Sequence, residues 1–157
     1  MRRAALLVTF CASCSSGMSH AVVDGPRPVD ASVDPTVLRV DGQYATAVTL
    51  QQNTCQGITV QSMPTTVAHT PGATDLTLTH AGQTYAGTVQ RNGTFATVPR
   101  SVGTTQELHT ITISGQFSTT GFVATVSAAV SHNGTHDCDY TVGWVGTKDG
   151  EPNVIPG

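Results

Sequence analysis

Apolar and hydroxyl-bearing residues alternate along three stretches in the second half of the chain. Because successive side chains of a β-strand point to opposite faces, a period of two predicts strands with one apolar and one polar face. The positions between the apolar ones carry mainly threonine and serine. The apolar positions are Ile111, Ile113 and Phe117 in the first stretch, Phe122, Ala124, Val126, Ala128 and Val130 in the second, and Cys138, Tyr140, Val142 and Trp144 in the third.

Turn sequences separate the predicted strands at short intervals. Asn92-Gly93 and Asn133-Gly134 are strong hairpin signals, because both residues accept the positive φ of a type I′ turn. Residues 80–82 and 118–121 mark two further hairpins, and no segment has a convincing helical period. About eight strands are therefore predicted, at residues 43–50, 58–69, 75–79, 83–89, 94–98, 108–117, 122–130 and 137–144.

Short turns between consecutive strands predict an all-β fold, an antiparallel up-and-down meander. Eight such strands can hide their edges by closing into a small β-barrel, whereas a two-sheet sandwich would need longer crossovers. The pattern resembles small envelope or secreted barrels of the lipocalin-like kind in architecture only, and the Gly-x-Trp of that family is absent near the first strand. Eight aromatic residues in the chain leave open whether the interior is filled.

The first seventeen residues have the form of an export signal. Arg2 and Arg3 precede a short apolar run, residues 4–12, and small residues follow. A positive n-region, an apolar core of fewer than fifteen residues and small residues at the cut are typical of a secretory signal peptide. The run is too short to span a bilayer as a helix. The chain is therefore expected to be exported.

The sequence around Cys14 resembles the lipobox of bacterial lipoproteins. In that family a small residue precedes a cysteine that receives a diacylglyceryl group and becomes the mature N-terminus, and Ala12 and Ser13 fit this pattern. Cys11 stands where the family usually has leucine. The resemblance implies lipidation at Cys14 and a membrane partner. The alternative is an ordinary signal peptide cut near Ser13 or Gly17, which would give a secreted protein.

Four segments follow from these signals. Residues 1–13 are the signal peptide, and residues 14–36, rich in Ser, Gly, Asp and Pro, are expected to be a lipidated flexible tether. Residues 37–147 form the β-barrel domain, and residues 148–157 are expected to be an irregular C-terminal tail.

Composition supports strands and excludes one class of partner. Charged residues make up 11% of the chain, against about 25% in an ordinary soluble domain. Threonine and valine, which occur 26 and 19 times, are β-branched and favour pleated sheets. The formal net charge is −3, and becomes −5 without Arg2 and Arg3. Such a balance gives no basic surface for nucleic acid.

Two cysteines remain in the predicted domain, Cys55 and Cys138. Exported proteins fold in oxidising compartments, where a pair of cysteines most economically forms one disulfide. If the first strand runs towards Cys55, alternation of strand direction places both cysteines at the same end of the barrel. The sequence therefore predicts a Cys55–Cys138 bond, with two unrelated thiols as the alternative.

The same alternation places four of the six histidines at that end. Imidazole is a common ligand of Zn²⁺ and Cu²⁺, so His80, His109, His132 and His136 are candidate metal ligands. The alternative is that they are ordinary polar loop residues. Apart from such a metal, no cofactor is expected.

No motif names a catalytic centre. The chain has no Gly-x-Ser-x-Gly, no phosphate-binding loop, no His-Glu-x-x-His and no paired carboxylates, so we expect it not to be an enzyme. The function expected is binding or interaction at the cell envelope, in the outer membrane or periplasm. The partner would be a small molecule in the barrel mouth or an envelope protein on the outer threonine-rich face. The alternatives are a metal-binding protein that uses the histidine rim and a structural envelope protein without a ligand.

Overall fold

The structure is a computed structural model that describes residues 34–157. The predicted signal peptide, Cys14 and nearly all of the predicted tether lie outside the described residues. Leu38, next to the predicted start of the domain at residue 37, is only 4% exposed.

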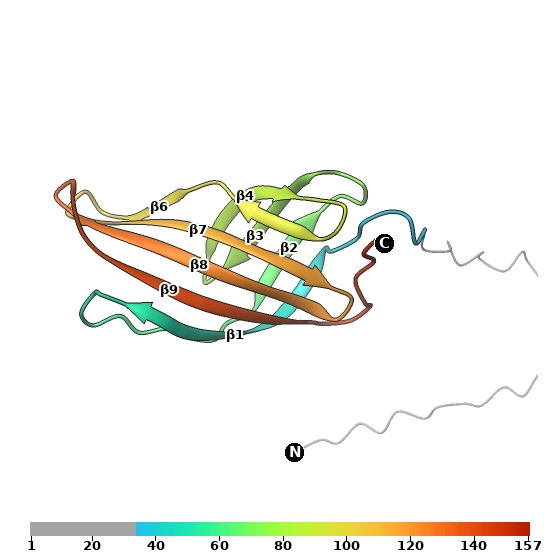
Figure 1. Cartoon of the computed structure of the whole chain (residues 1–157), viewed down its shortest axis with the longest axis horizontal. Coiled ribbons are helices and arrows are strands. Elements are labelled where there is room, and N and C mark those ends of the chain that lie inside the picture. Colours follow the sequence, from blue (N-terminus) through green and yellow to red (C-terminus); the bar gives the residue numbers. More distant parts are fainter. Residues whose placement is uncertain (1–33) are drawn as a thin grey trace, which may run out of the picture. The chain divides into compact units, whose positions relative to one another are not determined.

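Nine strands form one antiparallel sheet, and residues 34–157 contain no helix (Figure 1). The strands are β1 (Gly42–Asn53), β2 (Thr65–His69), β3 (Asp75–His80), β4 (Gln83–Val89), β5 (Thr94–Thr97), β6 (Arg100–Gly103), β7 (Glu107–Ser118), β8 (Gly121–His132) and β9 (Thr135–Lys148). Their order is β5-β4-β3-β2-β1-β9-β8-β7-β6, and β5 also pairs with β7. Eight strands therefore close into a barrel, which confirms the predicted all-β meander.

The ninth strand, β6, has no counterpart among the predicted strands. It pairs with β7 from Arg100↔Ile111 to Gly103↔Leu108 and continues the direction of β5 along the same neighbour. Pro99 interrupts the two strands, because proline cannot donate a backbone hydrogen bond to a ladder. β6 has only four residues, which follow a proline and end in glycine. Such a short segment shows too little alternation to be recognised as a strand from the sequence.

The strands differ greatly in length. β1, β7, β8 and β9 have 12 to 14 residues, whereas β2 to β6 have four to seven. At about 3.3 Å per residue, the long strands reach roughly 40 Å or more and the short ones about 13–23 Å. β1 pairs with β2 only over Gly42–Tyr44. The barrel thus closes around one end of the long strands, and their other end continues as a sheet extension (Figure 1).

Aromatic side chains fill the closed end. Tyr44, Phe95, Phe117 and Phe122 are at most 2% exposed. The ring centroids of Phe95 and Phe117 lie 4.7 Å apart, and those of Tyr44 and Phe122 lie 5.2 Å apart. The predicted apolar face is confirmed. Its buried members are Ile113, Phe117, Phe122, Ala124, Val126, Ala128, Val130, Val142 and Trp144, and Ile111, Cys138 and Tyr140 are partly exposed.

The C-terminal segment belongs to the domain, contrary to the predicted tail over 148–157. β9 extends to Lys148, and the 4% exposed side chain of Asn153 lies under the β7–β8 hairpin. Its Oδ1 lies 2.7 Å from the Tyr44 hydroxyl, and its Nδ2 donates to the carbonyl oxygen of Ser118 at 2.8 Å. Val154 also forms a β-bridge with Arg39. A buried amide with several partners fixes this segment although its sequence has no strand period.

Candidate functional site

The interior of the described barrel is packed with side chains. Sixteen buried apolar residues form one core cluster, to which Leu38 and Val40 contribute from the segment before β1. A hollow of about 610 Å³ beside Arg39, Asp41 and Lys148 opens on the surface of the closed end. A small molecule bound inside the barrel would therefore have to displace aromatic rings.

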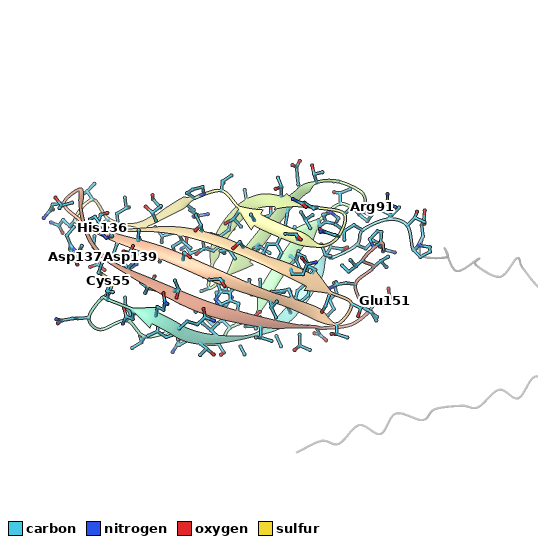
Figure 2. All side chains as sticks on the ribbon, in the orientation of Figure 1. Cys55, Arg91, His136, Asp137, Asp139 and Glu151 are labelled. Atoms are coloured by element: carbon cyan, nitrogen blue, oxygen red, sulfur yellow. A yellow bond between two sulfur atoms is a disulfide. The ribbon has the colours of Figure 1, made fainter. Side chains whose placement is uncertain are left out.

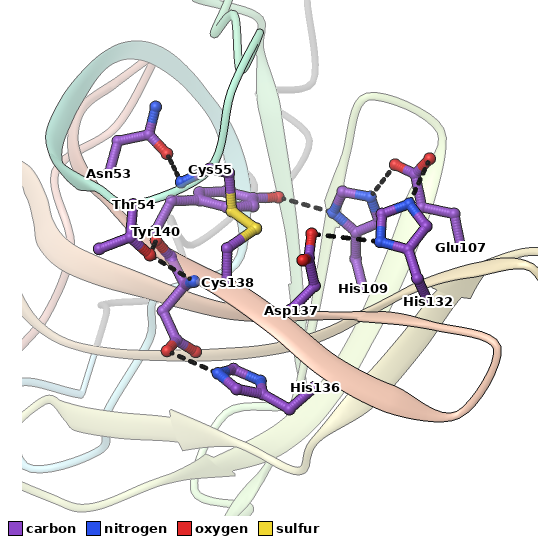
Figure 3. The surroundings of a disulfide bond; sticks show 11 residues. Asn53, Thr54, Cys55, Glu107, His109, His132, His136, Asp137, Cys138 and Tyr140 are labelled. Atoms are coloured by element: carbon purple, nitrogen blue, oxygen red, sulfur yellow. Dashed lines mark hydrogen bonds and ion pairs between the residues drawn. A yellow bond between two sulfur atoms is a disulfide. The ribbon is translucent and has the colours of Figure 1, made fainter.

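The free end of the sheet extension carries five linked side chains, which we call the mouth network (Figure 3). Glu107 Oε1 lies 3.0 Å from Nε2 of His109, and Oε2 lies 3.6 Å from Nε2 of His132. Nδ1 of His132 lies 3.2 Å from Oδ2 of Asp137, and Nδ1 of His109 lies 3.2 Å from the hydroxyl of Tyr140. Both nitrogens of each ring thus face a polar group of the protein.

The network is open to water. The side chains of Glu107, His132 and Asp137 are each more than half exposed. The hydrogen bond with His109, followed by the charges of His109 and His132, lowers the pKa of the Glu107 carboxyl below its ordinary value. Burial raises the pKa of the Tyr140 phenol, so its hydroxyl keeps its proton. Exposed pairs of this kind are screened by solvent and contribute little to stability.

The four predicted metal ligands do not come together. His80 stacks on Trp144, with ring centroids 4.2 Å apart, and its Nδ1 lies 2.9 Å from the Thr65 hydroxyl. Trp144 lies four residues after Tyr140 on β9, which is about 13 Å along the strand. Strand direction was assigned correctly, but β3 is short. His80 therefore ends inside the closed barrel, whereas His109 and His132 lie at the tip of long strands.

His136 is also separate from the mouth network. Its Nε2 pairs with Oδ2 of Asp139 at 3.2 Å, and Figure 3 shows its ring on the other side of the β8–β9 hairpin from His132. Among residues 34–157, no group of three or more His, Cys, Asp or Glu side chains is arranged to hold a metal ion. The physical reason is that His109 and His132 already turn their nitrogens to Glu107, Asp137 and Tyr140.

The predicted disulfide between Cys55 and Cys138 is confirmed. It joins the segment after β1 to β9 at the free end of the extension, where Figure 2 shows Cys55 near His136, Asp137 and Asp139. Thr54 reinforces the connection, because its backbone N–H donates to the carbonyl oxygen of Asp139 at 2.9 Å. A disulfide of this kind fits an oxidising compartment. Beside it lies a polar surface hollow of about 450 Å³.

The opposite side of the long strands forms an uncharged surface, which we call the outer face. It contains mainly hydroxyl-bearing and small apolar side chains, together with Gln51 and Gln116, and no Asp, Glu, Lys or Arg. Val123 and Val145 are cross-strand partners on its two central strands, towards the closed end of the barrel, and each is 56% exposed. The outer face consists of Ala45, Ala47, Thr49, Gln51, Thr110, Thr112, Ser114, Gln116, Val123, Thr125, Ser127, Ala129, Thr141, Gly143, Val145 and Thr147.

Glu107 and Tyr140 of the mouth network were not predicted as site residues. Glu107 and His109 are two positions apart, and residues i and i+2 of a strand share a face. The Glu-x-His spacing at the start of β7 could therefore have indicated their contact. Tyr140 was assigned to the core, and its hydroxyl contact with His109 needs the β7–β8–β9 register, which the sequence alone does not provide.

Acid is expected to destabilise the domain through His80. Burial lowers the pKa of its imidazole below 6.5, whereas the unfolded chain takes up the proton near 6.5. The unfolded state therefore binds more protons below that pH, and stability falls as the pH drops, by at most about 1.4 kcal/mol per pH unit for one proton. Urea unfolding at pH 7.5 and 5.5, followed through the single Trp144, should show a smaller pH effect in His80→Gln. The exposed His136→Gln is the control, and equal behaviour of both variants would refute this prediction.

Comparison of the chain with models of known families, with curated proteins and with solved structures gives no match. The described residues also include no helix long and apolar enough to cross a membrane. The class that the fold and site define is thus a small, disulfide-bonded, antiparallel β-barrel with an open sheet extension.

Proposed function

We propose that the chain is an exported, non-enzymatic protein that is anchored to the cell envelope through lipid on Cys14 and binds another protein through its outer face. The observation that carries the proposal is the filled barrel. Tyr44, Phe95, Phe117 and Phe122 occupy the space that a small-molecule carrier would keep open. A barrel with a plugged interior and a wide exposed sheet favours interaction at its surface.

The outer face supports this proposal better than the mouth network does. The mouth network consists of polar side chains that already contact one another. On the outer face, by contrast, large apolar side chains are left in water: Val123, Val145 and, at its edge, Met63 at 41% exposure. Contiguous apolar surface on an exported domain costs solubility and commonly marks an interaction site.

Two features support export and anchoring. The Cys55–Cys138 bond fits an oxidising compartment. The N-terminal pattern resembles that of lipoproteins, and a diacylglyceryl group with a further acyl chain gives stable membrane attachment. Intact-mass measurement of the mature protein tests the anchor, since a lipid-free N-terminus beyond Cys14 would contradict it.

Site-specific photo-crosslinking in the native cells tests the binding surface. A photoreactive amino acid at Thr125, in the centre of the outer face, should give protein adducts. The same residue at Thr88, which is exposed on β4, is the matched control. Adducts from Thr88 but not from Thr125, or from neither position, would overturn the proposal.

A further inference from the structure

We infer that the partner of the outer face is a second copy of this chain, docked face to face about a two-fold axis near Val123 and Val145. The inference rests on the proposed function and names the partner of the same surface. Three properties of the outer face carry it: its exposed apolar side chains, its lack of charge and its size.

Exposed apolar side chains gather on this surface. Three of the four large apolar residues that are strongly exposed in the described chain, Met63, Val123 and Val145, lie on it or at its edge, and the fourth is Val98. Val145 lines one shallow hollow with Met63 and another with Val123, so the three form a continuous strip. A two-fold axis through this strip would bury each valine pair against its counterpart.

The charge distribution favours a like partner. The chain carries a formal charge of −3, so two copies that met through their charged surfaces would repel one another. The outer face is free of ionisable groups, with Asp139 at its end, beside Ala129. A charged partner surface would lose its hydration here without gaining an ion pair. A neutral face therefore requires a neutral partner, and the chain itself provides one.

The side chains also suit sheet-on-sheet packing. On the central strands β8 and β9 the face has only Ala, Gly, Thr, Ser and Val, which are short, and the longer Gln51 and Gln116 lie on the flanking strands β1 and β7. Two such faces can approach to about 10 Å with their strands at about −30°. The six buried aromatic residues Tyr44, Tyr85, Phe95, Phe117, Phe122 and Trp144 leave no ring on this face for a sugar to stack on. A carbohydrate partner is accordingly less well matched than a second protein sheet.

The size of the face sets the expected affinity. Seven residues on each of four strands cover roughly 450 Å² in projection, at about 4.8 Å between strands and 3.4 Å per residue. Two copies would bury an area at the low end of specific interfaces, so a dissociation constant above about 1 µM is expected in solution. Confinement of lipid-anchored copies to one membrane would raise their effective concentration and drive pairing.

Sedimentation equilibrium of residues 34–157, the compact unit that contains the whole core and the disulfide, tests the inference. Reversible dimers are expected between about 10 µM and 1 mM. Val145→Lys, which would bring two ammonium groups together at the axis, should weaken dimerisation at least roughly tenfold. Val98→Lys, equally exposed at 59% but outside the face, should leave it unchanged, and Val145→Thr should have a smaller effect than lysine.

Each result decides between the two proposals. A monomer throughout this range, or a dimer that Val145→Lys and Val98→Lys weaken equally, overturns the inference. If the domain is then monomeric while Thr125 still crosslinks to a different protein in cells, the interaction function stands with another partner. If Thr125 gives no adduct either, both fail. Circular dichroism of each variant, with an unchanged strand spectrum, shows that a loss of dimers is not a loss of folding.

Discussion

Replacement of Phe117 by alanine is expected to lower the free energy of unfolding by roughly 3–5 kcal/mol, the usual cost of removing a buried aromatic ring. Phe117 is 2% exposed, and its ring lies between three others. Its centroid is 4.7 Å from that of Phe95, 5.7 Å from that of Phe122 and 6.0 Å from that of Tyr44. These rings come from four strands, so the cavity would weaken the contacts that close the barrel.

Urea unfolding followed by Trp144 fluorescence measures this loss. Phe117→Leu keeps much of the buried volume and should cost clearly less than Phe117→Ala, and Val123→Ala, which removes exposed atoms, should change stability by less than about 0.5 kcal/mol. If Phe117→Ala does not fold, the graded loss in Phe117→Leu still tests the prediction. A Phe117→Ala variant within 1 kcal/mol of the parent would show that the ring is not central to the core.

Local sequence information is sufficient for most of the architecture. The alternation around Val126 and the turn at Asn133-Gly134 predict hairpins because both act between neighbours in sequence. The barrel follows from them, since eight short-turn strands with one apolar face have few ways to cover their edges. The structure agrees in strand order, in closure through β5 and β7 and in the buried face of β8.

The parts that were predicted wrongly depend on contacts between distant residues. Strand length decides which side chains lie at the same level, and it is set by pairing: β1 continues to Asn53 because β9 remains beside it. His80 therefore ends next to Trp144 and not next to His132. Likewise, the segment after Lys148 is fixed by the buried Asn153 side chain, a polar contact that leaves no periodic signal in the sequence.

In the candidate site, too, some contacts follow from the local sequence and others depend on residues that are distant in the chain. The Cys55–Cys138 bond could be predicted from the expected oxidising compartment, the number of cysteines and the direction of the strands. The contact of Glu107 with His132 needs the β7–β8 register, in which the two residues lie opposite each other. The outer face was recognisable as threonine-rich, but its lack of charge matters only because four strands bring these residues side by side.

Removal of the disulfide in Cys55→Ala/Cys138→Ala is expected to cost roughly 2–4 kcal/mol and to lower the melting temperature by roughly 10 °C. The bond spans 83 residues, for which the loop-entropy model gives about 4–5 kcal/mol as an upper value. The structure adds a local reason. Beyond Tyr44, β1 pairs with β9 on one side only, and the segment that returns to β2 is fixed there by the disulfide and by the Ser62 hydroxyl, which accepts from the Val48 N–H at 3.0 Å.

Loss of the bond should therefore affect the sheet extension more than the closed barrel. Hydrogen exchange should accelerate most in residues 45–60. The amides around Phe95 and Phe117 should exchange faster only to the extent that the global stability falls. Reduction of the parent protein should reproduce the variant, because both lose the same covalent link. Quantitative alkylation of both thiols without prior reduction would contradict the bond itself, and an unchanged melting temperature in the double variant would contradict its role. Uniformly faster exchange would mean that the extension and the barrel unfold as one unit.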